Sequence, residues 1–276
     1  MTTDGLEAKE KRLRDFLGEC GSLVVAFSGG LDSALLLEVA HEVLGERVLA
    51  ATAVSAIYPR KERAAAEAFA RALGVRLVTV ETDELGMADF ARNTPERCYV
   101  CKRALFGRLR EIARREDMAY VADGANADDE KDYRPGMRAA RELGVVSPLM
   151  EAGLTKADVR ALSKRLGLAT WDKGPSTCLA TRVPYGEVIT REKLAMIEAA
   201  EEFLGELGFR QARVRHHGAV ARIEVAADEI ERLASGGVRE GVVHKLKAIG
   251  YHYVCLDAEG YRTGSLNEVL PRDETR

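Results

Sequence analysis

VVAFSGGLDS, residues 24–33, is the stretch of this 276-residue chain that decides the fold. The apolar run before Ser28 predicts a buried strand, and an apolar-periodic stretch that begins at Ala34 predicts a helix. Gly29 and Gly30 predict a tight loop between them, because glycine adopts positive φ angles and leaves room for a ligand against the backbone. Backbone N–H groups of such a loop and of a helix N-terminus favour an anion. The stretch therefore predicts a phosphate-binding strand–loop–helix unit.

Apolar runs of strand length alternate with helical patterns through the first part of the chain. The strand candidates are residues 23–27, 48–54, 75–80, 119–122 and 145–149. The clearest helical patterns are residues 34–44, 63–73 and 156–166, with another that follows Cys101. Such alternation is typical of an α/β fold with a doubly wound parallel sheet.

The pattern changes after Trp171. Residues 172–189 contain several glycines and prolines and predict an ordered loop. Helical patterns then occur at 191–207, 228–234 and 239–249, and strand candidates at 212–216, 219–225 and 251–256. We therefore predict a first domain over residues 1–180 and a small α+β domain over residues 181–276.

Composition limits the class of protein. The chain is 46% hydrophobic and 31% charged with a net charge of −3, which predicts a globular protein without a general attraction to nucleic acid or membranes. The first five residues do not open a signal peptide, and no apolar run approaches the roughly 18 residues of a membrane span. We therefore expect a cytoplasmic protein. Five cysteines, an odd number, argue against a disulfide framework.

Three cysteines lie in patterns that indicate chemistry. Cys98 and Cys101 form a C-x-x-C motif that leads into a helix, a spacing that suits zinc, redox or iron–sulfur chemistry. Cys178 lies in a loop of small residues, and zinc would need a fourth ligand that the sequence does not identify. Three thiolates and one open position suit a 4Fe-4S cluster. Cys20 and Cys255 accompany apolar segments, which predicts buried core cysteines.

The loop at residues 28–33 lacks the Gly-Lys-Ser/Thr of a Walker motif. It resembles the pyrophosphate loop, or PP-loop, of enzymes that cleave ATP between its α- and β-phosphates. Together with four other segments, it makes the chain resemble the LarE family of PP-loop sulfur transferases. The segments are ERCYVCK (96–102), DGANADD (123–129), DYRPG (132–136) and PSTCLATR (175–182).

This resemblance implies an enzyme that uses ATP, magnesium and a sulfur source. Such enzymes adenylate the carboxylates of pyridinium-3,5-biscarboxylic acid mononucleotide, release pyrophosphate and AMP, and form thiocarboxylates for the nickel-pincer nucleotide cofactor of lactate racemase. In one version the cysteine at the position of Cys178 gives up its own sulfur. In the other, Cys98, Cys101 and Cys178 hold a 4Fe-4S cluster that carries an extra sulfide, supplied as sulfide or by another donor. The three thiols favour the cluster version, and the family implies a homo-oligomer. From the net charge we expect no nucleic-acid partner.

The resemblance also implies residues for the ATP site in the domain over residues 1–180. The expected phosphate-binding residues are Ser28, Gly29, Gly30, Asp32 and Ser33, and Asp32 is also a magnesium candidate. Ser55 follows the second strand, where PP-loop enzymes receive adenine, and Asp123, Gly124 and Asn126 end a later strand at the same sheet edge. Lys102, Arg134 and Arg138 fit either phosphate binding or a solvated surface.

The domain over residues 181–276 is expected to bind the phosphate of the substrate and to support oligomerisation. Arg213 and Arg215 alternate with Val214, so both fall on one face of a strand, where a phosphate between them relieves their repulsion. The resemblance adds a metal ion contacted by acids such as Glu201 and Glu224. His216 and His217 fit turn positions equally well.

Three other interpretations remain at the level of the sequence. A PP-loop amidotransferase or an NAD synthetase-like enzyme explains the loop but has no need of three thiols. A cluster-dependent tRNA thiolase usually adds zinc-binding cysteine pairs or an RNA-binding module, which the sequence does not display. A sensor that binds ATP without turnover does not explain Asp32, Ser33 and the position of Cys178.

Overall fold

The computed structural model of the chain describes residues 3–131 and 135–270. The chain divides into two compact units. Unit 1 consists of Met1–Thr82 and Cys98–Ser176, and unit 2 consists of Asp83–Arg97 and Thr177–Arg276. Unit 2 therefore combines the C-terminal third of the chain with a short segment that interrupts the sequence of unit 1.

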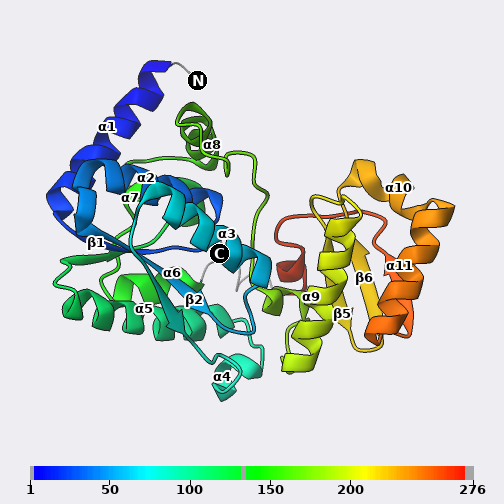
Figure 1. Cartoon of the computed structure of the whole chain (residues 1–276). Coiled ribbons are helices and arrows are strands. Elements are labelled where there is room, and N and C mark those ends of the chain that lie inside the picture. Colours follow the sequence, from blue (N-terminus) through cyan, green and yellow to red (C-terminus); the bar gives the residue numbers. More distant parts are fainter. Residues whose placement is uncertain (1–2, 132–134, 271–276) are drawn as a thin grey trace. The chain divides into compact units, whose positions relative to one another are not determined.

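A four-stranded parallel sheet forms the centre of unit 1 (Figure 1). Its strands, in spatial order, are β3 (Leu77–Glu81), β2 (Val48–Val54), β1 (Leu23–Ala26) and β4 (Tyr120–Ala122). Val25 of β1 pairs with Ala50 of β2 on one side and with Ala122 of β4 on the other. The predicted α/β fold with a parallel sheet is confirmed.

The predicted strand at residues 145–149 is wrong. Val146 makes a single parallel bridge to Ala122, and the helix α7 (Pro148–Glu151) begins two residues later. Proline has no backbone N–H for a sheet, and its fixed φ suits the first position of a helix. Pro148 therefore ends the strand pairing before it extends.

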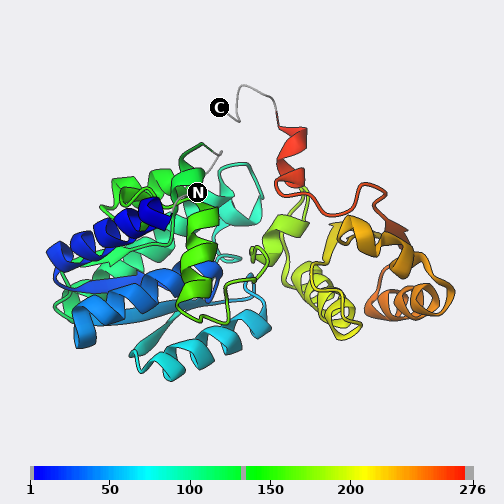
Figure 2. The same cartoon turned by 90° about the horizontal axis from the view of Figure 1, so that it is seen from above.

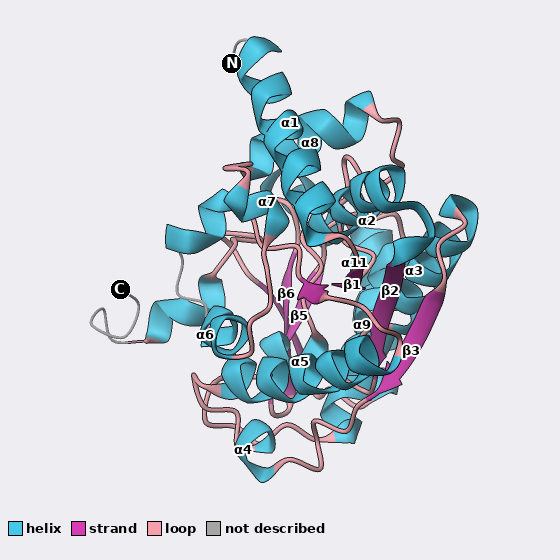
Figure 3. Ribbon diagram, turned by 90° about the vertical axis from the view of Figure 1, so that its left-hand side faces the viewer, coloured by secondary structure: helices cyan, strands magenta, loops and turns pink. Residues whose placement is uncertain are grey.

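Helices cover both faces of the sheet (Figure 3). One buried core contains Leu23 and Val25 of β1 with residues of α1 (Thr3–Cys20), α2 (Leu31–Leu44), α3 (Arg60–Leu73), α7 and α8 (Lys156–Arg165). The other core contains Val24 with residues of α5 (Arg97–Arg115) and α6 (Pro135–Glu142). Successive side chains of β1 thus alternate between the two cores, as strand geometry requires. The sequence analysis did not predict α1.

The strand order locates the ligand-binding edge of unit 1. From β1 the chain proceeds to β2 and β3 on one side and later returns to β4 on the other side. Doubly wound sheets bind ligands at the carboxyl ends of their strands where the order reverses. In unit 1 that position lies between the ends of β1 and β4, directly at the glycine loop.

Unit 2 contains a three-stranded sheet of β5 (Arg213–His217), β6 (Val220–Glu224) and β7 (Tyr253–Leu256). β5 pairs with β6 antiparallel, and β6 pairs with β7 parallel. Helices α9 (Arg191–Glu206) and α11 (Gly236–Ile249) lie side by side against its apolar face (Figure 2), with the short α4 (Ala88–Ala91) and α10 (Ile230–Ala234) completing the unit. This arrangement fits the predicted small α+β fold. No helix within residues 3–131 and 135–270 is long and apolar enough to cross a membrane.

Cys20 and Cys255, both predicted to lie in the core, differ in their exposure to solvent. Cys20 is buried, as predicted, at the end of α1. Cys255 is exposed, so the prediction for this residue is wrong. β7 lies at the edge of its sheet, and its successive side chains point to opposite faces. Val254 and Leu256 pack against the core, so Cys255 lies on the other face.

Candidate functional site

The glycine loop after β1 has the conformation of a phosphate-binding turn. Gly29 has a φ of +68°, whereas Gly30 has φ −80° and ψ 168°, so only the first glycine adopts the left-handed region. A Cβ atom at Gly29 would lie 3.0 Å from the Cβ of Ala66 in α3. The loop therefore requires glycine at position 29 for both its backbone conformation and its packing.

The loop leads directly into the N-terminus of α2. Gly30 occupies the N-cap position and makes no side-chain cap, so the N–H groups of the first turn have no acceptor from a capping side chain. The hydroxyls of Ser28 and Ser33 lie 3.1 Å apart, and Ser28 Oγ also accepts from Gly30 N at 3.3 Å. These groups form an array of donors around the start of a 14-residue helix, which favours an anion.

The end of β4 lies against the same helix start. A Cβ atom at Gly124 would be 3.0 Å from the backbone nitrogen of Ser33. Asn126 Nδ2 donates to Asp32 Oδ1 at 3.2 Å, and Asp123 Oδ1 accepts from Ser147 Oγ at 2.8 Å. The structure thus brings Asp32, in the first turn of α2, together with Gly124 and Asn126, which follow β4 and are far from Asp32 in sequence.

Two lysines that the sequence analysis did not identify also reach the loop. Lys156, the first residue of α8, forms an ion pair with Asp32. Lys173 Nζ donates to the carbonyl of Gly29 at 2.9 Å and pairs with Glu62 Oε2 at 2.6 Å. Only the fold brings these side chains to the loop. A lysine directly after the capping residue Thr155 was the one local signal available.

Ser55 follows the carboxyl end of β2, at the same edge of the sheet. Its Oγ accepts a hydrogen bond from Ile57 N at 3.4 Å, and its carbonyl accepts one from Tyr58 N at 3.3 Å. The residue therefore lies in a turn beside the strand that pairs with β1. Its predicted contact with adenine stays a prediction.

Cys98 and Cys101 lie three residues apart in the first turns of α5, so they share one side of the helix. Cys101 is buried and lies 3.9 Å from the hydroxyl of Tyr58, whereas Cys98 is half-buried. Within residues 3–131 and 135–270, no three His, Cys, Asp or Glu side chains are arranged to hold a metal ion. The cluster with Cys178 as third ligand, and the magnesium site at Asp32, therefore stay predictions.

Lys102, Arg134 and Arg138, whose roles the sequence leaves open, differ in their surroundings. The amine of Lys102 lies 5.2 Å from the centre of the Phe106 ring. The guanidinium of Arg138 stacks over Tyr99 at 4.0 Å and lies 3.8 Å from Glu142. Arg134 lies outside the described residues. Lys102 is half-buried and Arg138 is exposed, and the choice between a phosphate contact and a surface role stays open for both.

In unit 2, Cys178 directly precedes the short 3-10 helix η3 (Leu179–Arg182). Its thiol is half-buried, and its carbonyl accepts hydrogen bonds from the backbone nitrogen and hydroxyl of Thr181 and from Arg182. Arg182 is buried and forms a bidentate pair with Glu201 at 2.8 and 2.9 Å. The sequence analysis quoted Arg182 within its motif but assigned it no role.

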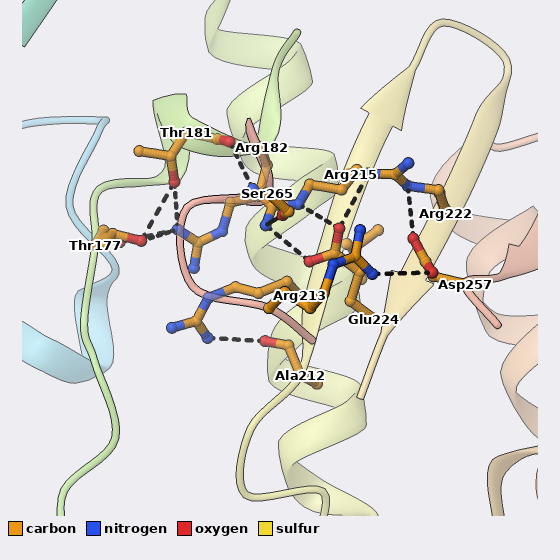
Figure 4. A network of polar contacts seen from close by, with 12 residues as sticks. Thr177, Thr181, Arg182, Ala212, Arg213, Arg215, Arg222, Glu224, Asp257 and Ser265 are labelled. Atoms are coloured by element: carbon orange, nitrogen blue, oxygen red, sulfur yellow. Dashed lines mark hydrogen bonds and ion pairs between the residues drawn. The ribbon is translucent and has the colours of Figure 1, made fainter. Parts of the chain in front are cut away.

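The strands β5 and β6 carry a second group of paired charges (Figure 4). Arg213 and Arg215 lie on the face opposite Val214, and Arg215 forms a bidentate pair with Glu224 at 2.9 and 2.7 Å. Arg222 also contacts Glu224, at 3.0 Å. The structure therefore brings Arg213, Arg215 and Glu224 together, and it occupies Glu224 with guanidinium groups.

Arg182 and Arg213 differ in the direction of their pKa shifts. Burial has the largest single effect and lowers the pKa of Arg182, but the charge and the hydrogen bond of Glu201, with smaller contributions from Cys178 and Tyr261, together outweigh it, so the net pKa is raised. Burial lowers the pKa of Arg213, the repulsion by Arg182 lowers it further, and Glu201 offsets only part of this. The lowered pKa of Arg213 thus has burial as its main cause, and the neighbouring cation of Arg182 adds to it.

A parallel sheet with a glycine loop, an open helix N-terminus and polar residues at its switch point defines a nucleotide-binding α/β protein of the PP-loop class. In agreement, the sequence model of the family described as NAD synthase matches residues 6–120.

Comparison with known proteins defines the family. The chain is 38% identical to a pyridinium-3,5-bisthiocarboxylic acid mononucleotide synthase of Lactiplantibacillus plantarum, over 97% of this chain and 96% of the relative. It is 42% identical to an uncharacterized protein of Synechocystis, over 97% of this chain and the full length of the relative. An uncharacterized protein of Methanocaldococcus jannaschii is 30% identical over 87% of this chain and 91% of the relative. The chain belongs to the LarE family, the family of the L. plantarum synthase.

Proposed function

We propose that this chain converts the carboxylates of pyridinium-3,5-biscarboxylic acid mononucleotide into thiocarboxylates, with ATP as the activating substrate. The observation that carries the proposal is the identity of 38% over nearly the whole chain to a synthase of the bisthiocarboxylic product. The glycine loop at the switch point of unit 1 supports ATP as the activating substrate. Together they favour sulfur transfer over the amidotransferase and tRNA thiolase alternatives.

In the proposed first step, a carboxylate oxygen of the substrate attacks the α-phosphorus of ATP. The bond to the β-phosphate oxygen breaks, so pyrophosphate leaves and an acyl-adenylate forms. Donors from Ser28, Ser33 and the first turn of α2 would hold the phosphates, and Lys156 and Lys173 would offset the charge of the leaving pyrophosphate. Asp32 has the oxygen chemistry that magnesium prefers.

In the proposed second step, sulfur attacks the activated carbonyl and AMP leaves, which gives the thiocarboxylate. A 4Fe-4S cluster bound by Cys98, Cys101 and Cys178 would supply a replaceable sulfide. The donor set supports this assignment, because three thiolates leave one iron open and the first two already share a side of α5. In the alternative, the sulfur of Cys178 itself is transferred and a dehydroalanine remains.

The phosphate of the mononucleotide would bind at the guanidinium cluster around Arg213 in unit 2. The lowered pKa of Arg213, caused by burial and by the neighbouring cation of Arg182, supports an anion partner at this position. A nucleotide phosphate offers the bidentate geometry that guanidinium groups recognise.

The test is a reaction of the anaerobically purified protein with ATP, magnesium and the pyridinium biscarboxylate mononucleotide. We expect release of pyrophosphate that depends on the substrate, together with thiocarboxylate detected by mass spectrometry. Pyrophosphate release that requires ammonia, with an amide as product, would establish an amidotransferase instead. Sulfur transfer in protein without iron, with dehydroalanine at position 178, would overturn the cluster.

A further inference from the structure

The backbone around Cys178 is fixed to an unusual degree for a loop. We call residues 177–182 the Cys178 turn. The carbonyl oxygen of Cys178 accepts three hydrogen bonds, from Thr181 N at 3.1 Å, from Thr181 Oγ1 at 2.9 Å and from Arg182 Nη1 at 3.1 Å. Loops usually leave such carbonyls to solvent. Here the half-buried Thr181 and the buried Arg182 both donate to a single peptide oxygen.

Arg182 is the centre of this arrangement. Its Nη1, which carries two hydrogens, also lies within hydrogen-bond distance of the carbonyl of Thr177 at 3.1 Å and of the hydroxyls of Thr177 and Thr181 at 2.6 and 2.8 Å. The opposite edge of the guanidinium is held by Glu201, whose Oε1 also accepts from Val214 N at 3.0 Å. Glu201 therefore ties the planar guanidinium to the edge of β5, and the guanidinium ties both ends of the turn together.

Arg215 of β5 is held by a carboxylate in the same way. Its Nε and Nη2 bind the two oxygens of Glu224, which is 1% exposed, and its Nη1 donates to the carbonyl of Thr181 at 2.8 Å. Nη2 also donates to Ser265 Oγ at 3.0 Å. Figure 4 shows Arg182 and Arg215 on the same side of β5 as Thr181. Two carboxylate-held arginines thus reach one turn.

We propose that Arg182 and Arg215 act as positioning residues that hold the Cys178 turn in the geometry needed for sulfur transfer, with Glu201 and Glu224 as their anchors. This inference rests on the proposed function, since it assigns these residues to the second step. A planar guanidinium with fixed donors transmits position better than a flexible ammonium does. An error of about 1 Å in the position of a reacting atom costs on the order of 100-fold in rate.

The proposal separates two arginines that the sequence pattern made equivalent. Arg215 binds Glu224 through Nε and Nη2 and the carbonyl of Thr181 through Nη1. A substrate phosphate would therefore have to displace a buried carboxylate from Arg215. Arg213 instead donates from Nη1 to the carbonyl of Ala212 at 2.9 Å, and its guanidinium lies 5.5 Å from the centre of the Tyr261 ring. Arg215 is therefore assigned to the turn, whereas the phosphate contacts predicted for Arg213 and Arg215 and the metal contacts predicted for Glu201 and Glu224 stay predictions.

The test compares Arg182→Gln and Arg215→Gln with Arg239→Gln, which changes an exposed arginine of α11 in the same unit. Pyrophosphate release, the KM of the mononucleotide and the single-turnover rate of thiocarboxylate formation are measured for each. At saturating mononucleotide, we expect the first two variants to keep pyrophosphate release within about twofold while the sulfur-transfer rate falls about 100-fold. The Arg239 variant should match the parent protein in all three measurements.

Thr181→Val guards against variants that fail to fold, because it removes one donor to the Cys178 carbonyl without leaving a buried charge. It should slow sulfur transfer by about 10-fold, and amide hydrogen exchange of residues 177–182 should become faster. An unchanged transfer rate in all folded variants would overturn the proposal, as would an equal loss of pyrophosphate release. If the parent protein forms no thiocarboxylate, the proposed function fails. The positioning role is tested separately by amide hydrogen exchange of residues 177–182, and an unchanged exchange rate in the Arg182→Gln variant would contradict it.

Discussion

The glycine loop of unit 1 and the Cys178 turn of unit 2 are two ways to build a reactive site. The loop closes within six residues, since Ser28 and Ser33 bond each other across five positions. The turn depends on partners that are distant in sequence, with Glu201 19 positions from Arg182 and Ser265 50 positions from Arg215. The loop relies on backbone donors and glycine conformation, whereas the turn relies on buried ion pairs. Local geometry can thus be recognised in a sequence motif, and long-range charge pairing cannot.

Replacement of the cysteines should have the largest effect and tests whether the two units share one chemistry. If Cys98, Cys101 and Cys178 hold one cluster, alanine at any of them should abolish both sulfur transfer and the broad visible absorbance of the anaerobic protein. Cys20→Ala and Cys255→Ala serve as matched controls and should keep both properties. Retained single-turnover activity in Cys98→Ala and Cys101→Ala, with dehydroalanine at position 178 of the parent protein, would contradict the cluster.

Asp32→Ala should impair the glycine loop of unit 1 and leave the Cys178 turn of unit 2 intact. Asp32 contacts Asn126 and Lys156, so its loss removes a candidate magnesium ligand and disorders both partners. Pyrophosphate release should fall by about 100- to 1,000-fold while circular dichroism stays unchanged. Asp172→Asn, at an exposed position of the same unit, is the control. Near-normal release by Asp32→Ala would remove this residue from the ATP site.

Arg213→Ala should impair binding of the mononucleotide by unit 2 and leave the ATP site of unit 1 intact. Loss of a charge-assisted contact to the substrate phosphate should raise the KM of the mononucleotide by about 10- to 100-fold and leave the KM of ATP unchanged. Steady-state pyrophosphate release, measured against each substrate in turn, separates the two constants. A KM that does not move would assign Arg213 to the structure of unit 2 rather than to the substrate.

Gly29→Ala tests how far the loop depends on backbone conformation. The φ of +68° and the contact of 3.0 Å with Ala66 should cost about 1–2 kcal/mol of unfolding free energy. Gly74→Ala is the control, because Gly74 has a φ of +77° but no atom within 4 Å of the added Cβ. Thermal denaturation should show a larger fall in Tm for Gly29→Ala. Equal shifts in Tm would mean that the contact with Ala66 adds nothing.

The smallest expected effect concerns a buried charge of unit 1 outside the loop. Burial raises the pKa of Asp158, but hydrogen bonds from Lys9 and Thr155 lower it more, so the net pKa lies below its usual value. The folded state therefore binds fewer protons, and this stabilisation is present above about pH 4 and disappears as the pH falls through the lowered pKa. Asp158→Asn should cost about 1 kcal/mol at pH 7 and lose part of this pH dependence. Denaturant titrations at pH 7 and pH 3 measure both effects.

Asp15→Asn is the control for Asp158→Asn, since Asp15 pairs with Lys11 on the exposed side of α1. Its free energy of unfolding should change by only a few tenths of a kcal/mol, as for most exposed pairs. Equal losses in the two variants at pH 7 would contradict the role of burial at Asp158.

How much could be predicted from the sequence follows the same division between local and distant contacts. The parallel sheet and the loop at residues 28–33 were predicted because strand, helix and glycine signals lie within single short windows. The strand at residues 145–149 failed where Pro148 outweighed an apolar run. Lys156 and Lys173 were missed because only the folded chain brings them to Asp32 and Gly29. Likewise, no local pattern shows that Arg182 pairs with Glu201.

The segment Asp83–Arg97 has a consequence for the order in which the molecule is made. Within unit 2, Asn93 Nδ2 donates to the carbonyls of Val183 and Pro184, and Ile189 N donates to Ala91 O. Asn93 and Val183 are 90 positions apart. At about 5–20 residues per second, this segment leaves the ribosome roughly 5–20 s before its partners exist. The first part of unit 1 is therefore synthesised, together with the segment Asp83–Arg97, before the rest of unit 2 exists. A fragment that begins at residue 177 would lack the buried Asn93.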